Sequence, residues 1–295
     1  MKCLLDKFYE KTKGYYPFFK YCPPRYHIYY INKRASETLG YTYNYLEPQT
    51  LNEKIRWLIY NEKLKMKSIL TDKIKVKAYI TENIGEGHCA PIYGIWDKFE
   101  DIDFSYLPNK FVLKANHAWN TNIFIENKKQ LEDNKLIYRN ATRKWLKFHY
   151  EIYSLEPQYK FIKPKLFIEK KISENLFCRC DYRVHCFNGE PSLIEVSHTD
   201  KSSSFYDTKW NIMPYSYKGY QKKEKIPQPS ILEEMIEYSR ILAREFSYVR
   251  IDFAQTQSNA QIIEMTFTPY SGMIPFSDKA FDKELGDCIK LPIAS

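Results

Sequence analysis

Two acidic residues near the end of the chain, Asp252 and Glu264, have the spacing of a paired carboxylate site. Each lies in a short stretch of alternating apolar residues, and a polar turn separates the two stretches. A turn centred on Ser258 opposes Asp252 with Glu264 and Arg250 with Thr266. Directly opposed strand residues hold their Cβ atoms about 5 Å apart, where like charges repel. A shared proton, a divalent cation held jointly with substrate phosphates, or Arg250 as a plain counter-ion would offset that repulsion.

The apolar side of the same hairpin determines its register. The turn at Ser258 predicts three opposed apolar pairs: Val249 with Phe267, Ile251 with Met265, and Phe253 with Ile263. A register shift of one residue would break the apolar pairs and the charged pairs at the same time. The turn that follows, Pro269-Tyr-Ser-Gly272, offers backbone amides that could meet an anion.

The elements that must position these residues alternate between helices and strands. The pattern predicts helices that begin at the capping box Thr50–Glu53 and at Thr71–Asp72, the latter ending at Gly85, and further helices at about 130–150 and over 231–246. It predicts strands over 111–113, 165–172, 181–187 and 191–196, the last two joined by the hairpin turn Asn188-Gly189. We therefore expect an α+β fold with antiparallel hairpins.

Two regions carry no long periodic apolar pattern. Residues 1–50 hold ten tyrosines, and we interpret them as an extension that wraps a core. Residues 197–230 are rich in Ser, Pro and Lys, which is typical of a surface connection that contacts substrate.

Composition restricts the class of protein. The chain of 295 residues is 44% hydrophobic and 27% charged, which is ordinary globular usage and excludes a fibre. No run approaches the ~18 apolar residues of a membrane span, residues 1–6 do not resemble a signal peptide, and seven cysteines suggest reduced thiols, so we expect a cytoplasmic protein. The net charge of +9 suits nucleotide phosphates, acidic glycans or the inner face of an anionic membrane. No recognised nucleic-acid motif is present, so we expect no nucleic-acid partner.

The cysteines at 178, 180 and 186 have a spacing that matches no common zinc site, and we interpret them as structural.

Several motifs together resemble the TupA-like ATP-grasp proteins of capsular and cell-wall polysaccharide clusters. The resemblance runs from about residue 50 to the C-terminus. It is carried by Leu51-Asn-Glu-Lys-Ile-Arg-Trp57, Leu70-Thr-Asp-Lys73, Tyr93-Gly-Ile-Trp96, Phe111-Val-Leu-Lys114-Ala-Asn-His117, Cys186-Phe-Asn-Gly189, Phe205-Tyr-Asp207, Val249-Arg-Ile-Asp252 and Ile263-Glu-Met-Thr-Phe-Thr-Pro-Tyr-Ser-Gly272.

The resemblance implies an ATP-grasp fold, in which two α+β lobes with mainly antiparallel sheets close on ATP. It divides the chain into an N-terminal extension (1–50), an N-terminal α/β region (51–108), a small lid subdomain (109–165) and a C-terminal catalytic subdomain (166–295).

The resemblance also implies roles for single residues. Lys73 and Lys114 would contact ATP phosphates, Glu169 and the backbone through Lys171 would meet adenine, and Asp181 would meet ribose. Arg183 would reach the phosphates, and Arg250 would steady the transferred phosphoryl group. Asp252 and Glu264 would bind Mg²⁺, with Thr266 as a weaker oxygen ligand. His117 and His198 are candidates for substrate contact, although lone histidines are more often ordinary hydrogen-bonding residues.

Two positions depart from the family pattern. Thr266 stands where ATP-grasp proteins usually have Asn, and the lid loop 117–122 contains no glycine.

The activity that the resemblance implies is ATP-dependent amide formation through an acyl phosphate, with a hexuronic acid of a capsule or O-antigen precursor and an amino acid or small amine as substrates. The alternatives are a glycosyltransferase of the same pathway and a nucleotide- or glycan-binding module that has lost catalysis.

Overall fold

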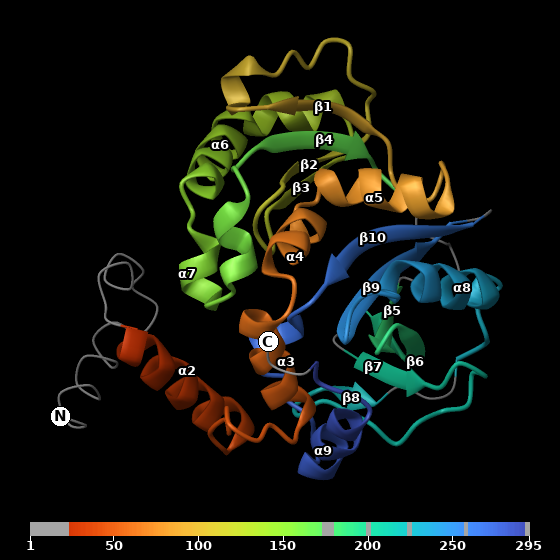
Figure 1. Cartoon of the computed structure of the whole chain (residues 1–295). Helices are drawn as coiled ribbons and strands as arrows, with labels where there is room; N and C mark the ends of the chain where they lie inside the picture. The colour runs from red at the N-terminus through yellow and green to blue at the C-terminus, as the bar shows by residue number, and fades with distance from the viewer. Residues whose placement is uncertain (1–23, 173–179, 199–201, 223–225, 257–258, 293–295) are drawn as a thin grey trace.

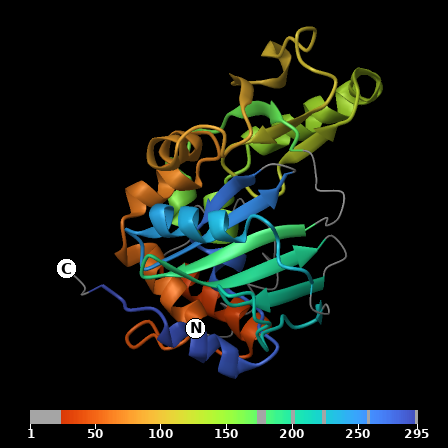
Figure 2. The ribbon, with the colours of Figure 1, turned by 90° about the vertical axis from the view of Figure 1, so that its right-hand side faces the viewer.

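The protein contains two sheets, each covered by helices (Figure 1). The computed structural model describes residues 24–172, 180–198, 202–222, 226–256 and 259–292. One sheet has four strands in the order β1-β4-β2-β3, and the other has six in the order β10-β9-β5-β6-β7-β8. Within these ranges, all strand pairings are antiparallel except the short parallel pair β7–β8. Figure 2 shows the smaller sheet and its helix as a separate layer above the larger sheet. The expected α+β class is confirmed.

The smaller sheet consists of β1 (Ile92–Trp96), β2 (Phe111–Ala115), β3 (Asn122–Ile125) and β4 (Leu166–Lys170). Strand alternation in β2 turns Phe111, Leu113 and Ala115 toward a core beneath helix α6 (Lys128–Leu146). Lys114 therefore lies on the opposite face. Helix α6 begins where the Asn127 side chain accepts the Gln130 N–H.

The larger sheet consists of β5 (Cys180–Phe187), β6 (Glu190–His198), β7 (Ser202–Tyr206), β8 (Gln221–Lys222), β9 (Tyr248–Gln255) and β10 (Ala260–Thr266). One face is apolar and packs on α5 (Lys75–Ile84) and α8 (Leu232–Ala243). The other face is divided. Its apolar end, which includes Phe187, Leu193 and Tyr248, packs on α3 (Leu51–Asn61) and on the segment around α9 (Lys279–Asp287), while its other end carries charged residues.

The remaining elements connect these layers. They are helices α2 (Pro24–Leu39), α4 (Leu64–Thr71) and α7 (Tyr150–Ser154) and the short 3-10 turns η2 (Phe99–Asp101), η3 (Pro157–Phe161) and η4 (Pro269–Gly272).

Most of the expected elements are present. Thr50 and Glu53 form the predicted capping box, α5 ends at Gly85, and both hairpins form. Among the described residues, no helix is long and apolar enough to cross a membrane. Cys186 is a buried free thiol, whereas Cys178 lies outside the described residues.

Four expectations need correction. The helix expected to begin at Thr71–Asp72 begins at Lys75, because Thr71 ends the separate helix α4. Residues 24–39, within the expected extension, form helix α2. The connection 197–230 is not purely a surface loop, because it includes the buried strand β7. A bulge between Ile262 and Glu264 sets Phe253 opposite Ile262 rather than Ile263, although Asp252 keeps its predicted partner.

Gly286 lets α9 lie directly against the start of α3, and its replacement tests this packing. A Cβ at position 286 would lie 2.3 Å from the Gln49 carbonyl oxygen and 2.6 Å from the Thr50 carbonyl carbon. Glycine-to-alanine changes in helices usually stabilise by about 1 kcal/mol. We expect Gly286→Ala instead to lower the free energy of unfolding by about 2 kcal/mol, measured in urea.

Lys283→Ala, on the exposed side of the same helix, serves as the control and should change stability little. A Gly286→Ala protein as stable as the wild type would contradict the close packing of α3 and α9.

Candidate active site

Four charged side chains lie in one row across four neighbouring strands. Glu264 on β10 is opposite Asp252 on β9, Asp252 is opposite Arg183 on β5, and Arg183 is opposite Glu195 on β6. The predicted facing of Asp252 and Glu264 is confirmed. We call these four residues the charged row. It lies on the face of the larger sheet that α5 and α8 leave uncovered.

Arg250 occupies the same face two residues before Asp252. Its Nε and Nη2 donate to the two Asp252 carboxylate oxygens over 2.7 and 2.6 Å, and Nη2 lies 3.9 Å from Glu264 Oε1. Burial raises the pKa of Asp252 to about 7, Arg250 opposes this, and the Glu264 charge adds to it. Arg250 therefore neutralises the carboxylate pair only in part.

Glu195, at the other end of the charged row, is buried and multiply bonded. It accepts from Arg183 Nη1 and from the Tyr217 hydroxyl, both over 2.8 Å, and its Oε2 lies 3.6 Å from His185 Nε2. Burial alone would raise the pKa of Glu195, but the Arg183 charge and the His185 contact hold it at about 2. Glu195 thus fixes Arg183 beside Asp252.

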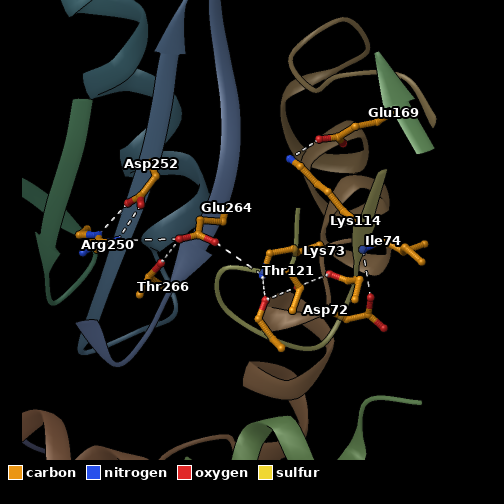
Figure 3. Close-up of polar contacts among 12 residues, drawn as sticks. Asp72, Lys73, Ile74, Lys114, Thr121, Glu169, Arg250, Asp252, Glu264 and Thr266 are labelled. Atoms are coloured by element: carbon orange, nitrogen blue, oxygen red, sulfur yellow. Dashed lines mark hydrogen bonds and ion pairs between the residues drawn. The ribbon is translucent and has the colours of Figure 1, made fainter. Parts of the chain in front are cut away.

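Lys73 brings a cation to the carboxylate pair from outside the larger sheet. Figure 3 shows Glu264 between Arg250 and Lys73. The Lys73 Nζ lies 3.8 Å from Glu264 Oε2 and donates to the Ala118 carbonyl over 3.1 Å. Its backbone N–H donates to the Asn116 carbonyl. Burial would raise the pKa of Glu264, but Lys73 and Arg250 lower it, so Glu264 is ionised.

Lys114 and Glu169 form a second ionic cluster on the smaller sheet. Glu169 Oε1 pairs with Lys114 Nζ, and Oε2 pairs with Lys77 Nζ over 2.6 Å. Against the effect of burial, the two lysines lower the pKa of Glu169. Figure 3 shows this cluster beyond Lys73 as seen from the carboxylate pair. Lys73, which bonds to the Asn116 and Ala118 carbonyls in the loop after β2, links the carboxylate pair to the smaller sheet.

The other candidate residues lie outside the two ionic clusters, either at the protein surface or in its interior. Lys171 pairs at the surface with Glu126, and Asp181 is exposed at the start of β5. His117 is buried, and its Nε2 lies 3.2 and 3.3 Å from the Trp145 and Phe148 carbonyls. Burial lowers its pKa, so the ring is neutral. The alternation of β6 sets His198 on the face opposite Glu195.

The turn that follows β10 is strained, which the sequence pattern does not predict. In η4, Tyr270 and Ser271 have φ values of 52° and 56°. Arg56, buried on α3, donates from Nη1 to the Ser271 carbonyl over 3.2 Å, and the Ser271 hydroxyl donates to Glu156 over 3.1 Å. These anchors hold a backbone conformation that would otherwise cost about 1–3 kcal/mol per residue.

The oxygen donors fit a magnesium ion that arrives with a nucleotide. Mg²⁺ is usually held by one or two carboxylates together with water and substrate phosphates. Asp252 and Glu264 supply the carboxylates, and the Thr266 hydroxyl lies 3.2 Å from Glu264 Oε1. Within the described part of the chain, no cluster of three or more His, Cys, Asp or Glu side chains could hold a metal ion by itself.

The buried Glu195 ion pair predicts a pH-dependent loss of stability. A carboxylate whose pKa falls from 4.5 to about 2 on folding contributes stability above pH 4.5 and loses it as the pH falls toward 2. We expect Glu195→Gln to lower the free energy of unfolding by about 3 kcal/mol near pH 7. The difference from wild type should shrink between pH 4.5 and pH 2.

Glu190→Gln is the matched control, because Glu190 lies on the same strand but is exposed. A Glu195→Gln deficit that stays constant as the pH falls would show that the Arg183–Glu195 pair does not stabilise the fold.

Comparison with known proteins identifies the family. The family model described as TupA-like ATPgrasp matches residues 53–290. No curated protein sequence matches. Similar solved structures include D-alanine–D-alanine ligase from Bacillus anthracis complexed with ATP (18% identity, 68% of this chain and 55% of that chain, TM-score 0.40) and the same enzyme from Helicobacter pylori (16% identity, 81% and 69%, TM-score 0.48). A third is the ATP-grasp ligase PsnB complexed with a phosphomimetic variant of its minimal precursor, Mg and ADP (11% identity, 75% and 57%, TM-score 0.41).

The chain spans little more than half of the Bacillus anthracis enzyme, and at these TM-scores the similarity supports no argument about activity. The family match, in contrast, covers most of the chain and includes both ionic clusters. The chain belongs to the TupA-like ATP-grasp family.

Proposed function

We propose that the protein is an ATP-dependent carboxylate–amine ligase that forms an amide through an acyl phosphate. The observation that carries the proposal is the Asp252–Glu264 pair, with Lys73 3.8 Å from Glu264 and Arg250 bonded to Asp252. Phosphoryl transfer depends on positioned cations and a metal more than on an enzyme nucleophile. Membership of an ATP-grasp family supports the same reaction class.

Each cluster has a separate task in this proposal. Lys114 and Lys73 bind the ATP phosphates, and Arg183 and Arg250 hold the transferred phosphoryl group. Asp252 and Glu264, with Thr266, would hold Mg²⁺, which supplies charge neutralisation to the phosphate oxygens. On the smaller sheet, Glu169 and the backbone through Lys171 receive the adenine, and on β5 Asp181 receives the ribose.

The reaction then proceeds in two substitutions. A substrate carboxylate oxygen attacks the γ-phosphorus and ADP leaves, which gives an acyl phosphate. The amine attacks the acyl carbon, phosphate leaves, and the amine loses a proton. Water must be excluded in between, because an acyl phosphate hydrolyses when it is wet. Closure of the smaller sheet over the charged row would provide that exclusion.

The proposed substrates follow from the family's setting. We propose the carboxyl group of a hexuronic acid in a capsular polysaccharide or O-antigen precursor, and an amino acid or small amine as the second substrate. The net charge of +9 favours such an acidic substrate, and we propose that the reaction takes place in the cytoplasm, at the inner face of the membrane for a lipid-linked precursor.

Product analysis separates this proposal from its rivals. The ligase should release ADP and phosphate only when a uronic acid and an amine are both present. Release of UDP from a nucleotide sugar without ATP consumption would indicate a glycosyltransferase instead. Binding of Mg-ATP without ADP formation, for every uronic acid and amine tried, would indicate a binding module.

The first prediction from this mechanism concerns Glu264. We expect Glu264→Gln to reduce ADP formation by roughly a hundredfold, because an amide is a poorer magnesium ligand and carries no charge. The thermal midpoint should change little, since Glu264 is only half-buried. The steady-state rate at saturating Mg-ATP measures the effect.

Glu245→Gln provides the control, since Glu245 is exposed and pairs only with Lys63 among the described residues. A wild-type rate of ADP formation in Glu264→Gln would show that Glu264 does not bind the catalytic metal.

The second prediction concerns Lys114. Lys114→Ala should raise the KM for ATP about tenfold with a smaller effect on kcat, because a charge-assisted contact to phosphate is lost. Lys110→Ala, an exposed residue just before the same strand, should leave the KM unchanged. An equal KM in both variants would show that Lys114 serves only to pair with Glu169.

A further inference from the structure

A hollow of about 450 Å³ lies at the edge of the larger sheet that β7 and β8 form. It forms where the segment between β7 and β8 meets the end of α2 and the start of α9, elements that lie near one another in Figure 1. None of its lining residues takes part in the nucleotide site proposed above.

Two lysines, Lys218 and Lys279, give the hollow a positive charge. Among the described residues, no carboxylate lies within 4.0 Å of either ammonium group. Lys279 Nζ instead lies over the Tyr41 ring, 5.9 Å from its centroid. The neighbouring Asp278 carboxylate is engaged, because it accepts the Ala280 N–H at the start of α9. Because no carboxylate of the described residues neutralises either ammonium group, the positive charge of the hollow favours an anionic ligand.

The rest of the lining combines aromatic rings with hydroxyl groups. Tyr217 packs against Tyr220 and Phe276, with ring centroids 5.6 and 5.7 Å away. The Ser216 and Ser277 hydroxyls lie 2.6 Å apart. Aromatic faces suit the C–H face of a sugar ring, and hydroxyl groups suit its polar edge. With the two lysines, this set matches a sugar that carries an acidic group.

Tyr217 connects the hollow to the charged row. Tyr217 is one of the residues that line the hollow, and its hydroxyl donates to Glu195 over 2.8 Å. Its ring also lies 5.5 Å from that of Tyr270, in the strained turn after β10. Tyr217 therefore lines the hollow and also touches both the charged row and that turn.

We propose that this hollow binds an anionic saccharide, one that carries a carboxylate or a phosphate. Its role as the site for the substrate chain rests on the proposed ligase function. Binding itself requires neither nucleotide nor turnover, because the hollow is formed by residues that the nucleotide site does not use. The two properties can therefore be measured separately.

Calorimetry on the full chain without nucleotide tests binding directly. Trigalacturonate supplies the carboxylate, glucose 1-phosphate the phosphate, and maltotriose a neutral saccharide. We expect one or both acidic probes to bind more tightly than maltotriose. The double variant Lys218→Ala, Lys279→Ala should weaken that binding about a hundredfold, since two charged contacts are lost.

The control is Lys283→Ala, which removes a lysine of α9 that pairs with Asp287 outside the hollow, and it should bind as the wild type does. Failure of both acidic probes to bind, equal binding of maltotriose, or undiminished binding by the double variant would each overturn the proposal. Glu264→Gln separates the two proposals: saccharide binding should persist in this variant while ADP formation falls. If the wild-type protein forms ADP but binds no acidic saccharide, the proposed saccharide site is wrong and the proposed ligase function stands.

Discussion

The structure depends on one cation, Arg183, that is held between acidic neighbours in a row of charges across four strands. Glu264, Asp252, Arg183 and Glu195 are each partly or fully buried, and a buried charge without a partner costs several kcal/mol. The row is stable only if β10, β9, β5 and β6 are neighbours in this order and in this register. One positive group between acidic neighbours leaves an excess of negative charge at the β9–β10 end. Arg250 and Lys73 approach that end, and it is the place where we propose that a metal and a triphosphate bind.

The two faces of the larger sheet explain how such a row can be held rigidly. Under α5 and α8 the sheet is apolar, so burial there stabilises the strands without any contribution from the charged residues. On the other face, α3 and α9 cover only the apolar end. Arg56 on α3 also anchors the strained turn after β10, so the helix that closes the core positions the backbone beside the carboxylates. Stability and site geometry thus depend on the same packing.

Much of this was predictable from local patterns, and the exceptions have identifiable physical causes. The facing of Asp252 and Glu264 followed from the apolar alternation of two strands, and the capping box predicted α3. Glu195 was missed because β6 contains a bulge: a regular two-residue turn at Asn188-Gly189 would pair Arg183 with Ile194, whereas the extra residue pairs it with Glu195. The pairing of Glu169 with Lys77 joins a helix to a distant strand, which no local pattern encodes. The domain limits and the roles of all the site residues stay predictions, including those of Asp181, Lys171, His117 and His198.

The central claim is that Asp252 and Glu264 together hold the metal that presents the triphosphate. Crystals grown with Mn²⁺ and a non-hydrolysable ATP analogue test it most directly. The anomalous signal of manganese locates the ion without any assumption about which residues bind it. The account predicts a peak in contact with both carboxylates and with phosphate oxygens, within reach of Lys73. A nucleotide bound with its metal elsewhere, while both Asp252 oxygens stay bonded to Arg250, would contradict it.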